Sequence, residues 1–178
     1  MGVTKKFQQP PRTGMEVFMM LPEGTLAELI NDRIYMSPAP NYSHQDLSGE
    51  LYTQLRTFIK KNNLGNCISA PVDVFFDDRN VLQPDILFIA TENMGIIKGG
   101  KVKGCPDMII EILSPGNKDH DKVIKKAAYE KFGVKEYFIV DPENKETITW
   151  YLTGKKYAKQ VSVKGKIKSK LLKKIFSF

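Results

Sequence analysis

Short apolar runs rich in β-branched and aromatic residues recur along this chain. Runs of this kind are typical of strands that are covered on both faces. They predict strands over residues 68–76, 81–90, 107–113 and 136–140, and a terminal hairpin over 147–152 and 157–163 around Gly154. The polar segment 77–80 predicts a hairpin turn between the first two of these strands. Residues 25–36 are expected to form either a short strand pair or a strand after a turn, with Asn31-Asp32 as the turn.

Two segments carry apolar residues at helical spacing. The first predicts a helix from about residue 41 to 61, which Asn41 or Ser43 can cap and Gly65 ends. The second predicts a helix over 119–132, stopped by Gly133. Because this second helix joins strands 107–113 and 136–140 by short connections, the unit predicts a right-handed crossover between two parallel strands.

The remaining segments are polar or rich in glycine and lysine. Residues 1–14 are expected to form a loose leader, 37–40 a loop, and 91–106, with four glycines and three lysines, a mobile loop. The lysine-rich stretch 164–174 alternates with apolar residues, which leaves strand and helix both open. No composition change marks a boundary, so residues 1–178 are expected to form one domain, in which 143–178 are a C-terminal hairpin and basic tail.

Composition narrows the class of protein. A chain of 178 residues with 42% hydrophobic residues is long enough for one folded domain. Its net charge of +7 favours an anionic partner such as nucleic acid. Cys67 and Cys105 form no CxxC or zinc spacing, so we expect free thiols in a reducing compartment. Neither a signal peptide nor an apolar run of membrane-spanning length is visible, which predicts a cytoplasmic protein without a membrane partner.

Two carboxylates stand where burial is costly. Asp85 follows Pro84 at the head of an apolar run, and Glu111 interrupts another. A buried carboxylate needs a cation or hydrogen-bond donors in place of water. If the two strands are neighbours, residue parity allows both carboxylates to point to one face. Two such oxygen ligands suit Mg²⁺ or Mn²⁺, with water in the remaining positions, and such an ion can polarise a phosphodiester and activate a water.

The predicted helix over 119–132 offers a basic partner for this site. Asp121, Lys125 and Tyr129 form a four-spaced row beside its apolar stripe. Lys125 is the lysine best placed to reach inward along the sheet. There it can hold the nucleophilic water or stabilise the charge of a phosphate.

In this order, the motifs resemble those of the PD-(D/E)XK nuclease superfamily, and more closely those of a family of small bacterial proteins called putative restriction endonucleases. The resemblance runs from about Leu26 to Pro142. The matching pieces are Ala27-Glu28-Leu29-Ile30-Asn31, Met36-Ser37-Pro38, His44, Gln83-Pro84-Asp85, Glu111-Ile112-Leu113-Ser114-Pro115, Asp121, Lys125, Tyr129, Gly133-Val134 and Glu136-Tyr137-Phe138-Ile139-Val140-Asp141-Pro142.

The resemblance implies an α/β (α+β) fold with a restriction-endonuclease-like core, in which helices flank a mixed β-sheet. It also implies a divalent metal, DNA cleavage and a homodimer, with no organic cofactor. One position departs from the superfamily pattern, because the lysine expected two residues after the acid is Leu113 here. In this branch of the superfamily the lysine role has moved to the following helix, which would be Lys125. Without that transfer, the chain would bind metal without cutting.

Plainer interpretations stand beside these. Lys125 can pair with Asp121 on the helix surface. Glu28 can be a third acid near the metal or can support a turn, and a lone His44 at a helix start is more often a packing or capping group. Tyr129 is more often a packing residue than a catalytic acid. Three functions stay open: a metal-dependent endonuclease, a non-catalytic nucleic-acid-binding module with the same fold, and an interaction protein whose buried acids only pair with lysines.

Overall fold

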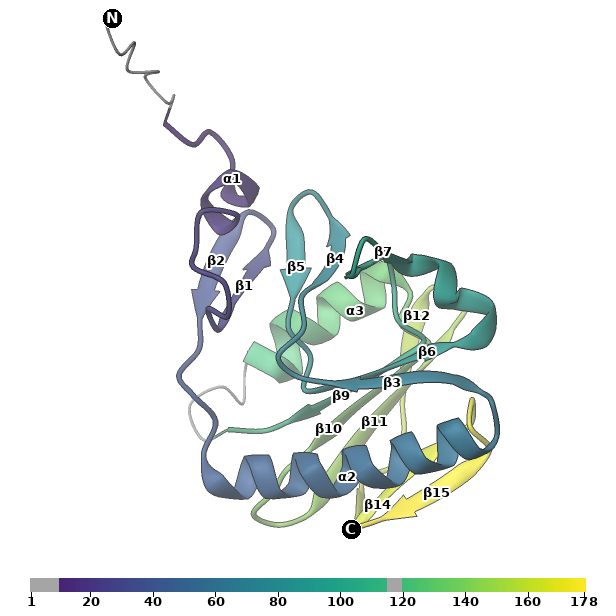
Figure 1. Cartoon of the computed structure of the whole chain (residues 1–178). Helices are drawn as coiled ribbons and strands as arrows, with labels where there is room; N and C mark the ends of the chain where they lie inside the picture. Colours follow the sequence, from purple (N-terminus) through teal and green to yellow (C-terminus); the bar gives the residue numbers. More distant parts are fainter. Residues whose placement is uncertain (1–9, 115–119) are drawn as a thin grey trace, which may run out of the picture.

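The computed structural model describes residues 10–114 and 120–178, without the side chains of His120 and Asp121. Among these residues, two mixed sheets and a small C-terminal hairpin make up the β-structure (Figure 1). The larger sheet has the strand order β12-β11-β10-β9-β6-β3, with β13 paired to β11. Its strands are β3 (Gly65–Ser69), β6 (Ile86–Ala90), β9 (Met108–Ile112), β10 (Glu136–Val140), β11 (Glu146–Thr153), β12 (Lys156–Lys159) and β13 (Val163–Lys164).

The smaller sheet has the order β2-β1-β5-β4-β8-β7. Its strands are β1 (Ala27–Ile30), β2 (Arg33–Met36), β4 (Val74–Asp77), β5 (Asn80–Leu82), β7 (Ile97–Lys98) and β8 (Lys101–Lys103). The C-terminal hairpin pairs β14 (Lys166–Ser169) with β15 (Lys174–Ser177). The helical segments are α1 (Gly14–Phe18), α2 (Tyr42–Lys61), the 3₁₀-helix η1 (Thr91–Ile96), the π-helix η2 (His120–Lys125) and α3 (Lys126–Phe132).

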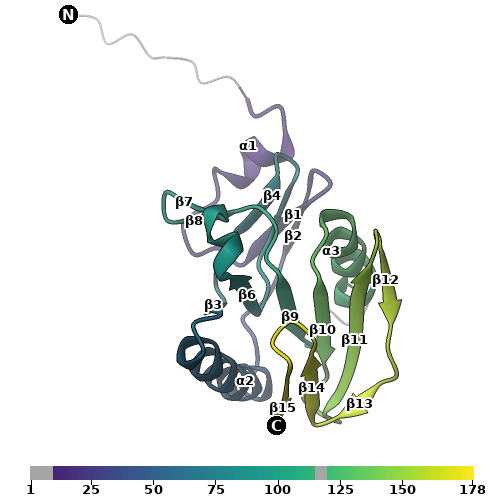
Figure 2. The same ribbon diagram turned by 90° about the vertical axis from the view of Figure 1, so that its right-hand side faces the viewer.

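The larger sheet is buried between two apolar layers, with α2 and α3 on its opposite sides (Figure 2). On one side, the stripe of α2 that ends at Ile59 packs on alternate residues of β6, β9 and β10, together with Ile167 and Phe176 of the C-terminal hairpin. On the other, Ala128 and Tyr129 of α3 pack on the intervening strand residues, and the smaller sheet adds Ile30 and others. This double coverage explains why the central strands are apolar on both faces, apart from the buried Glu111 of β9 and Glu136 of β10.

Several local predictions are confirmed. The strand pair at 25–36 is β1 and β2, with Asn31 and Asp32 at φ 51° and 63°, the left-handed conformation of a tight hairpin. Asn41 is the residue that caps α2, because its side chain accepts a hydrogen bond from His44 N. Strands β9 and β10 are parallel, and β11 and β12 form the hairpin that was predicted around Gly154.

Two predicted strands are wrong, because each is divided between the two sheets. The segment 68–76 contains the end of β3 and the start of β4, separated by a turn with a cis Ala70-Pro71 bond. The segment 81–90 contains the end of β5 and all of β6, and Asp85 lies in the bend between them rather than inside a strand. Pro84 accounts for this second break, since it has no N–H for a central strand.

Other segments are more ordered than predicted. Residues 91–106 contain η1, β7 and β8 instead of a mobile loop, with the left-handed Gly99 and Gly100 between the two strands. The lysine-rich stretch, for which strand and helix were both open, forms the β-hairpin β14–β15. The predicted leader lies outside the described residues at 1–9, and α1 already begins at Gly14. Of the short connection expected between residue 113 and the helix at 119, only Ser114 lies within the described residues.

The end of α2 differs in detail from the prediction. The helix ends at Lys61 with Asn62 as its C-cap, and Asn63 takes the left-handed conformation at φ 53°. Gly65 instead begins β3 at φ 138°, where an added Cβ would lie 2.1 Å from the carbonyl oxygen of Ile89. The glycine is therefore required by the close approach of β3 to β6 and not by the helix end.

The two cysteines are free thiols. Burial raises the pKa of Cys67 to about 12, and burial together with the nearby charge of Asp107 raises the pKa of Cys105 to about 12. Both thiols are therefore protonated and unreactive at neutral pH. No helix in the described part of the chain is long and apolar enough to cross a membrane.

Candidate active site

The sheet register brings the two predicted acids opposite each other. Strands β6 and β9 are antiparallel neighbours, with Ile86 opposite Ile110. Continuing this register by one residue places Asp85 opposite Glu111. The strand adjacency on which the shared site depended is therefore present, although Asp85 lies just outside its strand.

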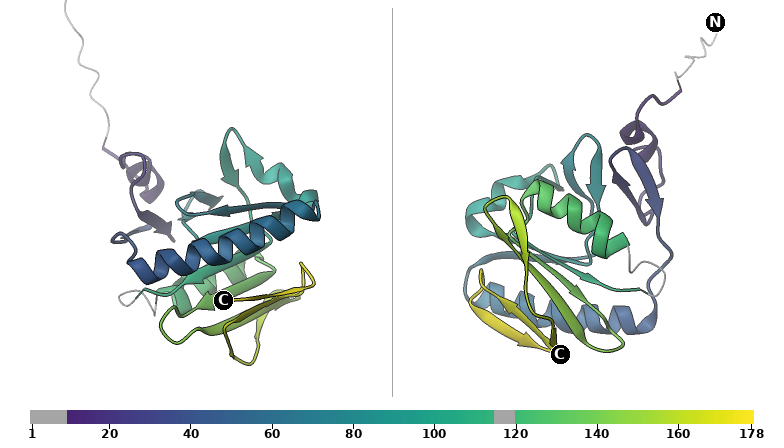
Figure 3. Two further views of the ribbon diagram at one scale, coloured as in Figure 1. Left: turned by 60° about the horizontal axis from the view of Figure 1, so that its bottom comes forward. Right: turned by 180° about the vertical axis from the view of Figure 1, so that it is seen from behind.

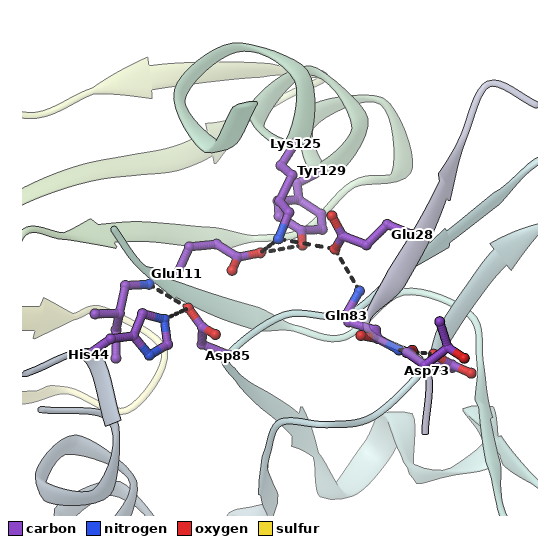
Figure 4. Close-up of polar contacts among 10 residues, drawn as sticks. Glu28, His44, Asp73, Gln83, Asp85, Glu111, Lys125 and Tyr129 are labelled. Carbon is purple, nitrogen blue, oxygen red and sulfur yellow. Dashed lines mark hydrogen bonds and ion pairs between the residues drawn. The ribbon is translucent and has the colours of Figure 1, made fainter. Parts of the chain in front are cut away.

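Asp85 is held by contacts from two elements (Figure 4). Its Oδ2 atom accepts a hydrogen bond from the backbone N of Ile112 at 2.7 Å and lies 3.1 Å from Nε2 of His44. His44 stands in the first turn of α2 and is buried, with 6% of its surface exposed. The backbone N of His44 donates to the cap residue Asn41 at 3.0 Å, and its ring contacts the carboxylate of Asp85.

Glu111 receives two donors from the helical segment that follows β9. Its Oε1 atom lies 3.1 Å from Nζ of Lys125 and accepts a hydrogen bond of 2.7 Å from the hydroxyl of Tyr129. Glu111 and Lys125 are both buried, with 2% and 7% of their surfaces exposed. The pKa of the fully buried Tyr129 is raised well above its ordinary value, first by burial and then by the negative charges of Glu111 and Glu28. Tyr129 is therefore a protonated donor at neutral pH.

Glu28 reaches the same place from the smaller sheet. Its Oε1 atom lies 3.0 Å from Nζ of Lys125 and accepts a hydrogen bond of 2.8 Å from the backbone N of Gln83. The Lys125 ammonium thus bridges Glu28 of β1 and Glu111 of β9, and links the two sheets. Glu28 does more than support its turn, because it pairs directly with the site lysine.

The helical segment that carries Lys125 is irregular. Lys125 is the last residue of the π-helix η2 and directly precedes α3. Single π-turns are uncommon and occur frequently at functional sites. Lys125 and Tyr129 share one face, as their four-residue spacing predicts, since both contact Glu111. Asp121 also lies in η2, but its side chain is outside the described part of the chain, so its predicted pairing with Lys125 is not tested.

Sequence reasoning did not select Gln83 and Asp73 as site residues. The side-chain amide of Gln83 donates to Oδ1 of Asp73 at 2.8 Å and to the carbonyl of Thr25 at 3.2 Å, while its backbone N holds Glu28. Gln83 therefore fixes the crossing point between the two sheets beside Asp85. Its position directly before Pro84-Asp85 could have marked Gln83 as a residue of the site. Nothing in the sequence indicated its contact with Glu28.

The acids and the lysine line one cavity of about 270 Å³. Glu28, His44, Asp85, Glu111 and Lys125 all contribute to its wall. Figure 4 shows the side chains of Glu111, Glu28 and Lys125 converging from three elements, with Asp85 and His44 beside them. The remaining wall is formed mainly by the loop after β2, the start of α2 and the turn after β3, namely Leu26, Ser37, Pro38, Ala39, Pro40, Asn41, Gln45, Ala70, Pro71, Gln83, Ile112 and Ser114.

The donor chemistry of this cavity fits a hard divalent cation. Mg²⁺ in proteins is usually held by one or two carboxylates, with water and substrate phosphate completing its shell, and Asp85 and Glu111 supply such carboxylates. Within the described ranges, no group of three or more His, Cys, Asp and Glu side chains is arranged to hold a metal ion. An ion at Asp85 and Glu111 would therefore depend on water or phosphate oxygens for most of its ligands.

The mixed sheet flanked by α2 and α3, with acids at the junction of two neighbouring strands, defines the restriction-endonuclease-like class of fold. The model of the Uma2 family, described as "Putative restriction endonuclease", matches residues 15–172, and the chain belongs to this family.

A solved structure has a similar fold. It is the crystal structure of a protein from Anabaena variabilis ATCC 29413 described as "a putative nuclease belonging to DUF820". The TM-score is 0.69 at 20% sequence identity, and the match covers 94% of this chain and 86% of that one. No curated protein matches this chain.

Proposed function

We propose that this protein is a metal-dependent endonuclease that hydrolyses phosphodiester bonds of DNA. One observation carries the proposal: Asp85, Glu111 and Lys125 come from separate elements and line a single cavity. The family description and the description of the structural neighbour support the nuclease class. The net charge of +7 agrees with a polyanionic substrate.

In this proposal Asp85 and Glu111 hold Mg²⁺ or Mn²⁺. When bound, the ion polarises the phosphodiester and lowers the pKa of an attacking water. His44 and the N–H of Ile112 keep the carboxylate of Asp85 in position, since both contact its Oδ2 atom. Tyr129 positions Glu111, because its hydroxyl donates a hydrogen bond of 2.7 Å to Oε1 of that carboxylate.

Lys125 supplies the positive charge that the protein itself brings to the cavity wall. Its ammonium is buried, and Glu28 and Glu111 fix its place at 3.0 and 3.1 Å. A cation held in a low-dielectric site stabilises the charge that develops on a phosphate more strongly than one in water. Lys125 would therefore stabilise the phosphate in the transition state or orient the attacking water.

The test is nicking of supercoiled plasmid by the purified protein with Mg²⁺ or Mn²⁺. Wild type is compared with Glu111→Gln and Asp85→Asn, which keep side-chain size and remove the charge. We expect both variants to fall at least about 100-fold in rate while they remain folded by circular dichroism. Equal nicking by wild type and both variants would mean that the activity is not located in this cavity.

A second candidate function is a nucleic-acid-binding module that keeps the fold without the chemistry. The observation that favours it is the Lys125 ammonium, which pairs with both Glu28 and Glu111 without a metal. Titration with Mn²⁺ in a calorimeter separates the two functions. The endonuclease predicts binding that Glu111→Gln weakens, whereas the module predicts DNA binding with no metal at these acids. An interaction protein whose acids only pair with lysines predicts neither.

A further inference from the structure

A second, smaller cavity continues from the candidate active site along α2. It measures about 130 Å³ and shares Pro40, His44, Gln45, Ala70 and Asp85 with the first cavity. Beyond these shared residues it is lined by Ser48, Gly49, Tyr52 and Ser69. We call this second cavity, together with Arg56 at its far end, the α2 groove. Most of its lining comes from α2 and from Ser69 and Ala70 at the end of β3. Figure 3 shows α2 alongside the larger sheet, of which β3 is the last strand at one edge.

The α2 groove follows the helix axis. Gln45, Gly49, Tyr52 and Arg56 are spaced by three or four residues and therefore form one row on α2. Gly49 is open to solvent, and a Cβ added there would meet no atom within 4 Å. This row therefore forms one wall of the groove, and the surface over Gly49 is open. Asp85 and His44 line the same cavity.

A fixed positive charge lies at the far end of this row. Nη1 of Arg56 donates to the carbonyl of Cys67 at 2.7 Å and to Oδ1 of Asn66 at 3.3 Å, both in β3. The same guanidinium stands 5.8 Å from the ring centre of Tyr52. Arg56 is thus anchored to the sheet edge rather than freely mobile. Lys60, which is exposed, follows it one helical turn later.

The acidic residues of α2 lie outside the row that lines the groove. Glu50 Oε1 contacts the amide of Gln54, which also donates to the carbonyl of Ser177 at the C-terminal hairpin. Asp46 is exposed and lies on the solvent face, between Gly49 and Glu50 on the helix surface. Arg56 therefore lies beside the groove, whereas Glu50 is linked through Gln54 to the end of β15.

We propose that the α2 groove binds the DNA strand next to the scissile phosphate, so that its backbone runs from Asp85 past Gly49 to Arg56. This inference rests on the proposed nuclease function and adds the path of the substrate. Arg56 would pair with a backbone phosphate, the open surface at Gly49 would let the strand approach the helix, and Tyr52 would contact the sugar or base. Such contacts position DNA without reading its sequence.

The test places opposite charges at Gly49, where an added Cβ meets no protein atom within 4 Å. The variants are Gly49→Glu and Gly49→Arg, with Gly49→Ala as the uncharged control. Thr57→Glu and Thr57→Arg make the same charge changes at an exposed position on the solvent side of α2. Binding of a short labelled DNA duplex is measured by fluorescence anisotropy at several salt concentrations, with Ca²⁺ in place of Mg²⁺ to suppress cutting. Plasmid nicking with Mg²⁺ is measured in parallel.

We expect Gly49→Glu to weaken DNA binding about tenfold and to reduce the salt slope by about 1, and Gly49→Arg to do the opposite. The change in the logarithm of the DNA affinity should be less than half as large for each Thr57 variant as for the Gly49 variant with the same charge. Equal effects at Gly49 and Thr57, or none at Gly49, while wild type still nicks plasmid, would overturn the groove and leave the nuclease standing. Failure of wild type both to bind and to nick DNA would overturn both.

Discussion

The Nζ atom of Lys125 lies 3.1 Å from Oε1 of Glu111, deep inside the protein and between two sheets. A lysine and a glutamate that are this buried stabilise each other only as a pair, because each charge has lost its water. The same ammonium lies 3.0 Å from Glu28. The charge balance of the candidate site therefore depends on one lysine.

Lys125→Met should remove nicking activity and also destabilise the fold. Two carboxylates would then face each other in a buried place, and we expect a loss of about 3–5 kcal/mol in the free energy of unfolding. Urea denaturation measures this loss.

Lys125→Arg separates the two effects. It keeps the charge and should fold, but its planar guanidinium cannot take the place of a compact ammonium, so nicking should still fall at least about tenfold. Full activity of Lys125→Arg would contradict a specific role for the lysine at the reacting phosphate.

Tyr129→Phe should lower nicking with only a modest loss of stability. The hydroxyl that donates to Glu111 disappears, and the ring still fills its place, so we expect a loss of about 1–2 kcal/mol. The matched control is Tyr157→Phe, which removes a hydroxyl bonded to the carbonyl of Val134 at 2.9 Å. Tyr157→Phe should cost similar stability and leave nicking unchanged. Equal loss of activity in both variants would show that Tyr129 acts through stability alone.

Glu136 predicts a dependence of stability on pH. It is buried on β10 and accepts hydrogen bonds from the hydroxyl of Ser169 and the backbone N of Lys170 and Leu171, which anchors the C-terminal hairpin. Burial raises the pKa of this carboxyl in the folded protein. The folded state therefore binds more protons than the unfolded state between the ordinary pKa and the raised one, and stability falls as pH rises through that window.

Glu136→Gln should remove this contribution, since the amide can accept the two backbone hydrogen bonds and donate to Ser169. We expect the free energy of unfolding of the variant to increase relative to that of wild type as pH rises above the ordinary glutamate pKa of about 4.3. Urea denaturation of both proteins over a pH series measures the difference. A difference that does not change with pH would contradict the raised pKa of Glu136.

Substitution by alanine should have opposite effects on stability at Gly65 and Gly49. Gly65→Ala would force a Cβ against the carbonyl of Ile89 at a φ of 138° and should cost at least about 2 kcal/mol. Gly49→Ala, in the open middle of α2, should gain up to about 1 kcal/mol through helix propensity. Thermal melts of the two variants provide the comparison. Similar melting temperatures would mean that β3 can move away from β6 without cost.

Homodimer formation stays a prediction of the family resemblance. Strand β12 ends the path of the larger sheet, and the nearby Val161 is 88% exposed. An exposed edge with an apolar side chain is a suitable contact for a second copy. Light scattering of wild type and Val161→Lys tests this: a dimer that becomes a monomer supports the edge as interface. A wild-type monomer at all concentrations would exclude the dimer.

The sequence by itself determined the elements whose periodicity is local. The row of apolar residues along α2, the parallel unit from β9 to β10 and the hairpin at Asn31-Asp32 follow from spacing, capping and turn chemistry, which act over a few residues. Local patterns also selected Asp85 and Glu111, because a carboxylate in or at the head of an apolar run needs a partner wherever the run lies. The helical spacing of residues 121, 125 and 129 selected Lys125.

Only the tertiary structure decided which sheet each strand joins. The apolar runs at 68–76 and 81–90 report burial but not neighbours, so their division between two sheets could not be predicted. The contact of Glu28 with Lys125, the bridging role of Gln83 and the groove between α2 and β3 depend on that division. They arise from the meeting of segments far apart in the chain, and no local pattern encodes such a contact.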